Sequence, residues 1–434
     1  MVIDTVTIAF PFNVADPLYI VTNGVMFVFI AVWFLRVLPM MVISSFYHSY
    51  VARLKARARA RRNNAPYTPF VSVIIPAYNE QVGLVNTIKT LIASSYPHME
   101  VLIVNDGSTD RTEDVMLDFL RKYRHATKGT ASAIAVRYYR KDNGGKGSAL
   151  NYGIDKARGE IIATFDADCV IAADCIERFV SYFVEPSIMA LAGTIKIGNQ
   201  GSFIGTMQHL EYLYSFVQKS AEALLGTIFV IGGAAAAFRK SVFDDIGGYD
   251  TAMRTEDMEL SFRIQQAGMR VFYAHDALVY TEGPSSWKGL YKQRVRWKHG
   301  RLEAMQRYKS SFFSRTVPNR RFFWFVLPFI ALQDLQYFAY AIFTILVLFF
   351  CFSAYNYAPI LATVLLVGAL YALVFVQDRA ERTWVSFALA PLGLFLFYFT
   401  AIVEIMALTK AYIAFWTGRK VTWQKWDRQG VIER

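Results

Sequence analysis

The sequence has few cysteines and few charged residues. Its three cysteines follow no disulfide or zinc-binding spacing, and its six histidines form no ligand pair at useful spacing; the cysteines are Cys169, Cys175 and Cys351. Charged residues make up only 18% of the chain, below the roughly 25% of soluble domains, whereas 54% is hydrophobic. The composition gives no sign of a disulfide framework or zinc site and predicts a soluble part joined to a membrane part.

Long hydrophobic runs occur near both ends of the chain. The first extends from Leu18 to Phe46, beyond the roughly 20 residues that cross a bilayer. It has no basic region before it and no small-residue cleavage site after it, so we predict a retained transmembrane helix rather than a signal peptide. The second region predicts three hydrophobic segments, at 322–352, 358–376 and 385–416.

The net charge of +12 raises the alternative of nucleic-acid binding. The basic residues, however, concentrate beside hydrophobic segments, above all directly after the first one, at Arg53, Lys55, Arg57, Arg59, Arg61 and Arg62. The positive-inside rule then places this flank and the middle of the chain in the cytoplasm. The same residues suit a helix on anionic headgroups. We therefore expect a cell-membrane protein with no nucleic-acid partner.

Strand and helix patterns alternate in the middle of the chain. β-branched or apolar runs predict strands at 71–75, 101–104, 133–139 and 161–165, and Lys146 to Ala157 predicts a helix. Such alternation is typical of an α/β domain with a mostly parallel sheet, in which ligands bind beyond the carboxyl ends of the strands. The polar residues that follow these strands are Tyr78, Asn79, Glu80, Asp106, Asp166 and Asp168.

Asp166 and Asp168 stand one residue apart after the last of these strands. Two such carboxylates repel each other, which a protein tolerates where a cation bridges them. Mg²⁺ or Mn²⁺ takes carboxylate oxygens together with substrate phosphates. A solvated acidic turn explains most isolated Asp-x-Asp pairs equally well, so the surrounding motifs decide between the two interpretations.

Six motifs occur in one order: VSVIIPAYNE at 71–80, VNDGSTD at 104–110, KGSALNYG at 146–153, DAD at 166–168, TED at 255–257 and QRVRW at 293–297. Together they resemble the signature of membrane-integrated family 2 glycosyltransferases, which include the synthases of cellulose, chitin, hyaluronan and poly-N-acetylglucosamine. The resemblance covers residues 66–310. It implies a GT-A fold, flanked by transmembrane and interfacial helices, that binds a UDP-sugar and Mg²⁺ or Mn²⁺.

The resemblance assigns donor contacts to the strand ends. It implies that the uracil and ribose are held by three residues, Tyr78, Glu80 and Asp106. It implies that Asp166 and Asp168 hold the metal and the ribose, with Asp168 the better candidate for the ion. Lys146 would neutralise the donor phosphate, although a lone lysine after glycines is more often a solvated surface residue.

The TED motif opens a predicted helix. An acidic helix N-terminus is a frequent structural pattern, because the helix dipole favours it. By resemblance, however, Asp257 is the general base that takes the proton from the acceptor hydroxyl, with Glu256 beside it in the catalytic set. Direct attack on the anomeric carbon inverts the configuration and gives a β-linked product.

The segment from Trp287 to Lys309 interleaves basic and apolar residues. This pattern predicts an amphipathic helix in the membrane interface. The resemblance adds that Gln293 contacts substrate, that Arg294 and Arg296 approach the donor diphosphate and that Trp297 stacks on the acceptor sugar. The small residues at 232–237 indicate either close helix–sheet packing or a wall of the acceptor site.

We expect six regions: an N-terminal segment with a transmembrane helix (1–50), a basic linker (51–65), the catalytic domain (66–282), an interface helix region (283–320), a membrane region (321–417) and a basic tail (418–434). A block in this tail, 423–430, is similar to one that lies near the cytoplasmic pocket of several such synthases. Three C-terminal spans would put the tail outside the cell. Either one segment is interfacial or re-entrant, with 322–352 the best candidate for a short interfacial piece because of Pro328 and Asp334, or the interpretation of the tail is wrong.

Two functions fit these motifs. The first is a processive synthase that extends and exports a β-glycan, and the second is a transferase that adds one sugar to a lipid acceptor. Several spans and the QRVRW block favour a polymer, and TED favours poly-N-acetylglucosamine or cellulose-like enzymes over hyaluronan synthases. The expected partners are a UDP-sugar, a glycan or lipid acceptor, the bilayer and a small accessory membrane subunit. The transferred sugar, its linkage and the oligomeric state are not encoded in any residue that we can identify.

Overall fold

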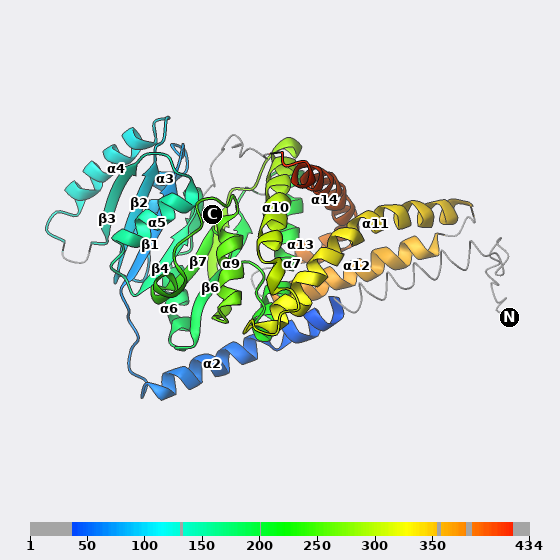
Figure 1. The fold of residues 1–434 in the computed structure, drawn as a ribbon, viewed down its shortest axis with the longest axis horizontal. Coiled ribbons are helices and arrows are strands. Elements are labelled where there is room, and N and C mark those ends of the chain that lie inside the picture. The colour runs from blue at the N-terminus through cyan, green and yellow to red at the C-terminus, as the bar shows by residue number, and fades with distance from the viewer. Residues whose placement is uncertain (1–36, 131–132, 200, 354–356, 379–383, 420–434) are drawn as a thin grey trace.

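The computed structural model describes residues 37–130, 133–199, 201–353, 357–378 and 384–419. Its centre is one eight-stranded sheet with the strand order β3-β2-β1-β4-β7-β6-β8-β5 (Figure 1). The strands are β1 Val71–Ala77, β2 Met99–Asp106, β3 Ala135–Lys141, β4 Ile161–Phe165, β5 Cys169–Ile171, β6 Ile188–Ile197, β7 Ala235–Arg239 and β8 Arg270–Thr281.

The first half of the sheet is parallel, as the alternating pattern predicts. β1 pairs in parallel with both β2 and β4, and β2 pairs in parallel with β3. The side chains of β1, β2 and β4 are almost wholly buried, which explains their continuous β-branched and apolar runs. All four predicted strands are confirmed, and their carboxyl ends meet at one edge of the sheet.

The second half is mixed. β7 runs antiparallel to both β4 and β6, β6 pairs in parallel with β8, and β5 closes the sheet antiparallel to β8. The small residues at 232–237 lead into β7, where Ala236 and Ala237 are buried between β4 and β6. The sheet is therefore mostly parallel with antiparallel insertions, the arrangement of a GT-A fold.

Helices of several lengths pack against this sheet and join its strands. Two helices flank the candidate active site that is described below: α5 lies directly before β4 in the chain, and α9 lies directly before β8 (Figure 1). The helices of this part are α2 Tyr47–Arg61, α3 Leu84–Ile92, α4 Thr112–Ala126, α5 Lys146–Lys156, α6 Cys175–Phe183, α7 Phe203–Leu225, α8 Ser241–Ile246 and α9 Glu256–Gln266.

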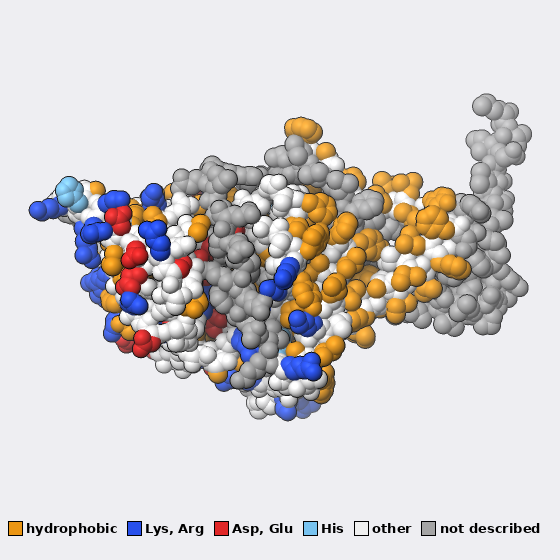
Figure 2. Space-filling view, turned by 90° about the horizontal axis from the view of Figure 1, so that it is seen from above, with side chains coloured by type: hydrophobic (Ala, Val, Ile, Leu, Met, Phe, Trp, Pro, Cys, Tyr) orange, Lys and Arg blue, Asp and Glu red, His pale blue; other side chains and the backbone are white. Residues whose placement is uncertain are grey.

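The remaining helices are apolar or amphipathic: α10 Trp287–Arg307, a π turn at Phe322–Val326, α11 Leu327–Ser353, α12 Ala358–Gln377, α13 Trp384–Leu389 and α14 Gly393–Trp416. Among the described residues, two helices are long and apolar enough to cross a membrane, Phe322–Leu346 and Tyr398–Trp416, and Thr363–Gln377 is a shorter apolar helix. Figure 2 shows hydrophobic side chains gathered over the half of the molecule away from the sheet. The first predicted span, Leu18 to Phe46, lies outside the described residues up to position 36.

The predicted segment 385–416 is not one continuous helix. A short 3₁₀ turn, Ala390–Leu392, separates α13 from α14, and Pro391 of this turn packs against Gly368 in the middle of α12. α14 then lies along α10: Phe399 contacts Trp287 near the start of α10, and Phe415 contacts His299 further along it. The chain thus turns at the middle of α12 and returns to the helix that lies beside the sheet.

The apolar helices are also fastened to the sheet. α12 ends next to a buried ion pair in which Lys196 of β6 lies 3.2 Å from Asp378. Just before this pair, Gln377 accepts a 2.7 Å hydrogen bond from Ser44, in the helical stretch 37–45. The end of α12 is therefore fixed both to the sheet and to the segment that precedes α2.

Candidate active site

The turns after β1 and β2 are held together by side chains. Asn79 adopts a positive φ of 55°, and its Oδ1 accepts a 2.8 Å hydrogen bond from the backbone N–H of Thr109. In return, Ser108 and Thr112 accept hydrogen bonds from the backbone N–H groups of Asn79 and Glu80, at 3.0 and 2.8 Å. These contacts hold Glu80, which is buried, beside the VNDGSTD loop and bring two predicted donor-binding motifs together.

Asp106 ends β2 and shapes the next loop. Its carboxylate accepts hydrogen bonds from the backbone N–H groups of Gly144 (3.0 Å) and Gly145 (2.8 Å) and from Nζ of Lys141 (2.7 Å). Gly145 has a φ of 87°, a conformation that glycine adopts without strain. Asp106 therefore fixes the turn that leads to Lys146, a role that the sequence did not indicate. Its contact with the uridine stays a prediction.

Lys146 starts α5 and connects two predicted motifs. Its Nζ lies 2.5 Å from Oδ1 of Asp166 and 3.6 Å from Oε1 of Glu256. Burial acts to lower the pKa of Lys146, but the charges of Asp166 and Glu256 outweigh this effect and raise the pKa above its ordinary value. A single half-buried ammonium thus joins the DAD motif to the TED motif.

The carboxylate of Asp257 is held by backbone donors. Its Oδ1 accepts a 2.9 Å hydrogen bond from the N–H of Met258, and its Oδ2 accepts one of 3.1 Å from the N–H of Gly233. A β-carbon at Gly233 would lie 2.9 Å from Nζ of Lys146. The glycine before β7 therefore leaves room for Lys146 and Asp257 close to the backbone, in addition to the two interpretations that the sequence suggested.

Glu256 lies next to Asp257 in the sequence and is buried. Burial raises its pKa to about 6, whereas the nearby charges of Lys146 and Arg296 act in the opposite direction. The charge of Arg296 thus acts on Glu256, and its approach to the donor diphosphate stays a prediction.

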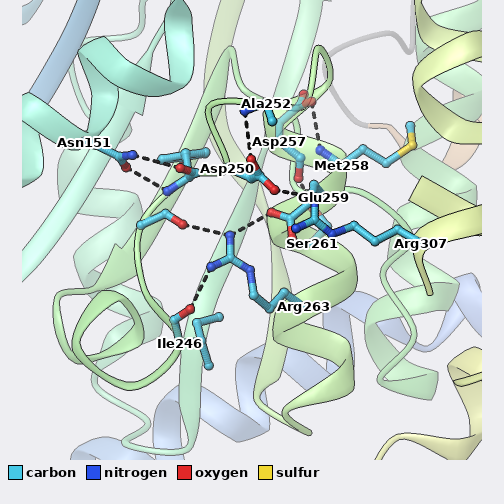
Figure 3. A network of polar contacts seen from close by, with 12 residues as sticks. Asn151, Ile246, Asp250, Ala252, Asp257, Met258, Glu259, Ser261, Arg263 and Arg307 are labelled. Carbon is cyan, nitrogen blue, oxygen red and sulfur yellow. Dashed lines mark hydrogen bonds and ion pairs between the residues drawn. The ribbon is translucent and has the colours of Figure 1, made fainter. Parts of the chain in front are cut away.

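The loop before the TED motif is fixed from three sides (Figure 3). Asn151 of α5 hydrogen-bonds the backbone N–H and C=O of Tyr249, at 2.7 and 2.8 Å. Arg263 of α9 donates to the carbonyl of Ile246 at 2.7 Å, and Arg307 of α10 forms an ion pair with Asp250. The position of Asp257 is thereby set by α5, α9 and α10 together. None of these three supports could be predicted from the sequence.

α10 packs directly on the start of α9. A β-carbon at Gly300 would lie 2.2 Å from Oγ1 of Thr255, so only glycine fits at this crossing. Gln293 is buried and Trp297 half-buried on the same helix. The QRVRW and TED motifs are thus brought together, as the predicted site requires.

Arg294 faces a different environment from Arg296. Its guanidinium lies 2.6 Å from Glu211 of α7 and 3.4 Å from Glu404 of α14, and it stacks on the ring of Trp297 at 4.6 Å. Its predicted approach to the diphosphate stays a prediction, because two carboxylates hold it here. An ionisable residue within an apolar segment is itself a signal of function, and by this rule Glu404 could have been found from the sequence.

Two further ion pairs attach α10 to the apolar helices. Lys298 lies 2.5 Å from Glu404, and Arg301 forms a buried ion pair with Asp334 of α11. Tyr412 of α14 donates a 3.3 Å hydrogen bond to the same Asp334. α10 therefore joins the TED motif on one side to α11 and α14 on the other.

Comparison with known proteins identifies the family. The model of glycosyl transferase family 2 matches residues 72–247, and that of glycosyl transferase family group 2 matches residues 161–417, more than half of the chain. The chain belongs to glycosyl transferase family group 2. The match extends from β4 through the TED motif, α10 and α14, so the family definition includes the membrane-type helices.

Two named relatives match this chain over part of its length and part of their own. The chain is 32% identical over 262 residues to the poly-β-1,6-N-acetyl-D-glucosamine synthases of Staphylococcus epidermidis (strain RP62A) and Staphylococcus aureus (strain COL). The match spans 60% of this chain and 60% of each relative. In fold, the chain resembles the mannosyltransferase PcManGT from Pyrobaculum calidifontis, solved with GDP-Man and Mn²⁺, with a TM-score of 0.55 and 18% identity over 88% of this chain and all of the other.

The two aspartates of the DAD motif suit a metal only in part. In the described parts of this family member, no group of three or more His, Cys, Asp or Glu side chains is arranged to hold an ion. Asp166 and Asp168 provide two carboxylates, and Mg²⁺ or Mn²⁺ commonly completes its shell with substrate phosphates. The site therefore fits such an ion together with a phosphate-bearing donor. In the present structure, Lys146 donates a hydrogen bond to one carboxylate oxygen of Asp166.

Proposed function

We propose that this protein is an inverting membrane glycosyltransferase that transfers a sugar from a UDP-sugar to the end of a growing β-linked polysaccharide. The observation that carries the proposal is the double contact of Lys146 with Asp166 and Glu256. Through this contact, the side chain of Lys146 bridges the carboxylates that would bind the donor and the acidic motif that contains Asp257. Donor and acceptor chemistry need this proximity.

Each motif has a task in this proposal. Tyr78, Glu80 and Asp106 bind the uracil and ribose at the ends of β1 and β2. Asp166 and Asp168 hold Mg²⁺ or Mn²⁺, which neutralises charge on the diphosphate. Lys146 adds a positive charge beside that diphosphate.

The acceptor side is built on α9 and α10. Asp257 accepts the proton of the attacking hydroxyl, with its carboxylate oriented by the N–H groups of Gly233 and Met258. Glu256 stays beside it, and Arg296 stabilises the departing UDP. Gln293 and Trp297 line the place of the acceptor sugar, and Arg294 keeps α10 in position through Glu211 and Glu404.

The polymer function is favoured over single transfer to a lipid. The named relatives are poly-β-1,6-N-acetyl-D-glucosamine synthases, and the matching region includes the apolar helices that an exporter needs. N-acetylglucosamine is accordingly the first donor sugar to test. Transfer of one sugar to a lipid remains the alternative, and product size separates the two.

The proposed membrane arrangement follows from the path of the chain. The sheet and the basic helix α2 lie in the cytoplasm, and α11 and α12 cross the bilayer and return. α13 enters to the middle of α12, where Pro391 meets Gly368, and α14 comes back along α10. With this one re-entrant segment, the end of α14 would lie on the catalytic side of the bilayer.

The purified protein in detergent tests this proposal. It is supplied with Mg²⁺ or Mn²⁺ and with UDP-N-acetylglucosamine, UDP-glucose or UDP-glucuronate in turn, and UDP release and product size are measured. We expect metal-dependent release with one donor, a β-linked polymer, and loss of both with Asp168→Ala. Release of UDP with a single-sugar lipid product contradicts the polymer, and the absence of release with every donor contradicts the transferase.

A further inference from the structure

A cavity of about 630 Å³ lies away from the catalytic motifs, where the segment that leads into α11 meets the sheet. Its walls come from the end of α7, the turn before β8 and residues 315–321. Four arginines and no acidic residue line it: Arg270, Arg315, Arg320 and Arg321. A cavity with this lining attracts anions.

The charges of these arginines are not neutralised within the described part of the chain. Arg315, Arg320 and Arg321 are exposed, and no carboxylate there forms an ion pair with them. Their hydrogen bonds go to neutral oxygens: Arg320 donates to the carbonyl of Arg315 at 2.7 Å, and Arg270 to the hydroxyls of Ser187 and Tyr50 at 2.8 and 2.9 Å. Most of their N–H donors are therefore available to a ligand.

The backbone that carries the arginines is fixed in place. The side chain of Asn319 donates to the carbonyl of Gly226 at 2.8 Å and to Gln265 at 2.6 Å. Pro318 packs so closely on Gly268 that a β-carbon there would lie 2.5 Å from it. The cavity is thus preformed, which reduces the entropy cost of binding.

The surroundings of the cavity indicate where its ligand comes from. Three of the four arginines, Arg315, Arg320 and Arg321, directly precede the candidate span Phe322–Leu346. Two exposed aromatic side chains flank them, Phe313 with 61% and Phe325 with 68% of its surface accessible. Nearby, Trp324 donates from its indole N–H to the carbonyl of Ser314 at 2.8 Å. Aromatic residues beside arginines at the start of a span are typical of the headgroup layer of a bilayer.

We propose that this cavity binds the phosphate headgroup of an anionic phospholipid from the bilayer surface. The guanidinium groups bind the phosphate, and the flanking phenylalanines enter the acyl boundary. None of the lining residues belongs to the catalytic cluster, so the site is separate from donor and acceptor binding. Scattered positive charge along a membrane protein is the competing explanation, and it predicts that any three exposed cations are equivalent.

The test uses the full-length protein in nanodiscs of phosphatidylcholine with increasing phosphatidylglycerol, and native mass spectrometry of the phosphatidylglycerol retained. The triple variant Arg315→Gln/Arg320→Gln/Arg321→Gln is compared with the charge-matched Arg121→Gln/Arg124→Gln/Lys128→Gln on the surface at and after α4. One arginine near the bilayer contributes roughly fivefold in affinity. We therefore expect retention to fall by about tenfold or more in the first variant only.

Other results overturn the proposal. Equal losses in both variants assign the effect to general charge. Saturable binding of inorganic phosphate by the wild type in pure phosphatidylcholine, lost in the first variant, assigns the cavity to a soluble anion instead. If the triple variant does not stay monodisperse, Arg315→Gln and Arg320→Gln alone decide, each with an expected loss of roughly fivefold.

Discussion

The ammonium nitrogen of Lys146 lies 2.5 Å from Oδ1 of Asp166, which joins two motifs that stand 20 residues apart in the sequence. The same nitrogen reaches Glu256 at 3.6 Å. In this arrangement the lysine takes the place of a cation between carboxylates. In the proposed function, Lys146 would instead bind the donor diphosphate and Asp166 would hold the metal, so we expect this contact to be exchanged when the donor binds.

Replacement of Lys146 by methionine tests this interpretation. Loss of the ammonium removes a charge-assisted hydrogen bond to the donor phosphate, worth roughly 1.5–3 kcal/mol, so we expect KM for the UDP-sugar to rise roughly tenfold or more. Lys122→Met, whose side chain is 77% exposed on α4, serves as the control. An unchanged KM in steady-state assays would return Lys146 to a structural role.

Asp257→Asn separates base catalysis from binding. The amide keeps the shape of the side chain but cannot accept the proton, so transfer should fall by roughly 10²–10⁴-fold, the usual contribution of a general base. UDP binding, measured by calorimetry, should stay near normal. The matched control is Asp155→Asn on the exposed surface of α5, with 71% of its side chain accessible. Turnover retained by Asp257→Asn would show that another group is the base.

Gly300→Ala should disturb the contact between α10 and α9. The new methyl group would meet Oγ1 of Thr255 at 2.2 Å, and such overpacking costs roughly 1–3 kcal/mol. We expect a lower thermal midpoint together with a lower kcat, because the adjoining TED motif moves. Gly201→Ala is the control, since nothing lies within 4 Å of a β-carbon there. Equal behaviour of the two variants would contradict the close crossing.

Glu404→Gln should destabilise the protein more than the removal of both Glu404 and Lys298, which form an ion pair. Glu404 neutralises Arg294 and Lys298 in a buried position, and loss of one partner of such a pair costs roughly 3–5 kcal/mol. In the double variant Glu404→Met/Lys298→Met, less buried charge stays uncompensated, so thermal unfolding in detergent should show a smaller loss. The single variants Glu404→Met and Lys298→Met are measured as well. If the loss of stability in the double variant equals the sum of the losses in these two single variants, the two groups do not interact.

The pH dependence of stability should reflect His275. Its ring lies 4.6 Å from that of His48, and burial lowers its pKa to about 4 from an ordinary value near 6.5. Between about pH 6.5 and pH 4, His275 is therefore protonated in the unfolded chain but neutral in the folded chain. Stability is complete above this window and falls through it as the pH falls. Thermal midpoints between pH 7.5 and 4.5 should fall less in His275→Gln than in the wild type. Identical slopes would exclude His275 as the cause.

The parallel half of the sheet could be predicted from the sequence because its strands are buried on both faces. The predicted strand 161–165 agrees with β4 at both ends, and the helix predicted from Lys146 ends within one residue of α5. The strand pattern also placed Asp106 and Asp166 at one edge. Local periodicity contains this information because each strand and helix buries its own face.

The remaining features depend on contacts that have no local signature. β7 runs antiparallel because it fills the space between β4 and β6, and no pattern in its alanines shows the direction. The different surroundings of Arg294 and Arg296 follow from Glu211 and Glu404, which lie 83 and 110 residues from Arg294 in the sequence. The break before α14 arises where Pro391 meets Gly368. Only the folded chain brings such partners together.

The buried pair of Lys196 and Asp378 has a mechanical consequence. The ion pair connects the C-terminal end of α12 to β6 of the central sheet. The hydrogen bond from Ser44 connects the same end to the helical stretch that precedes α2. A rotation of the sheet relative to α12 would therefore have to separate two buried charges, which restricts the motions open to the catalytic domain beside its apolar helices.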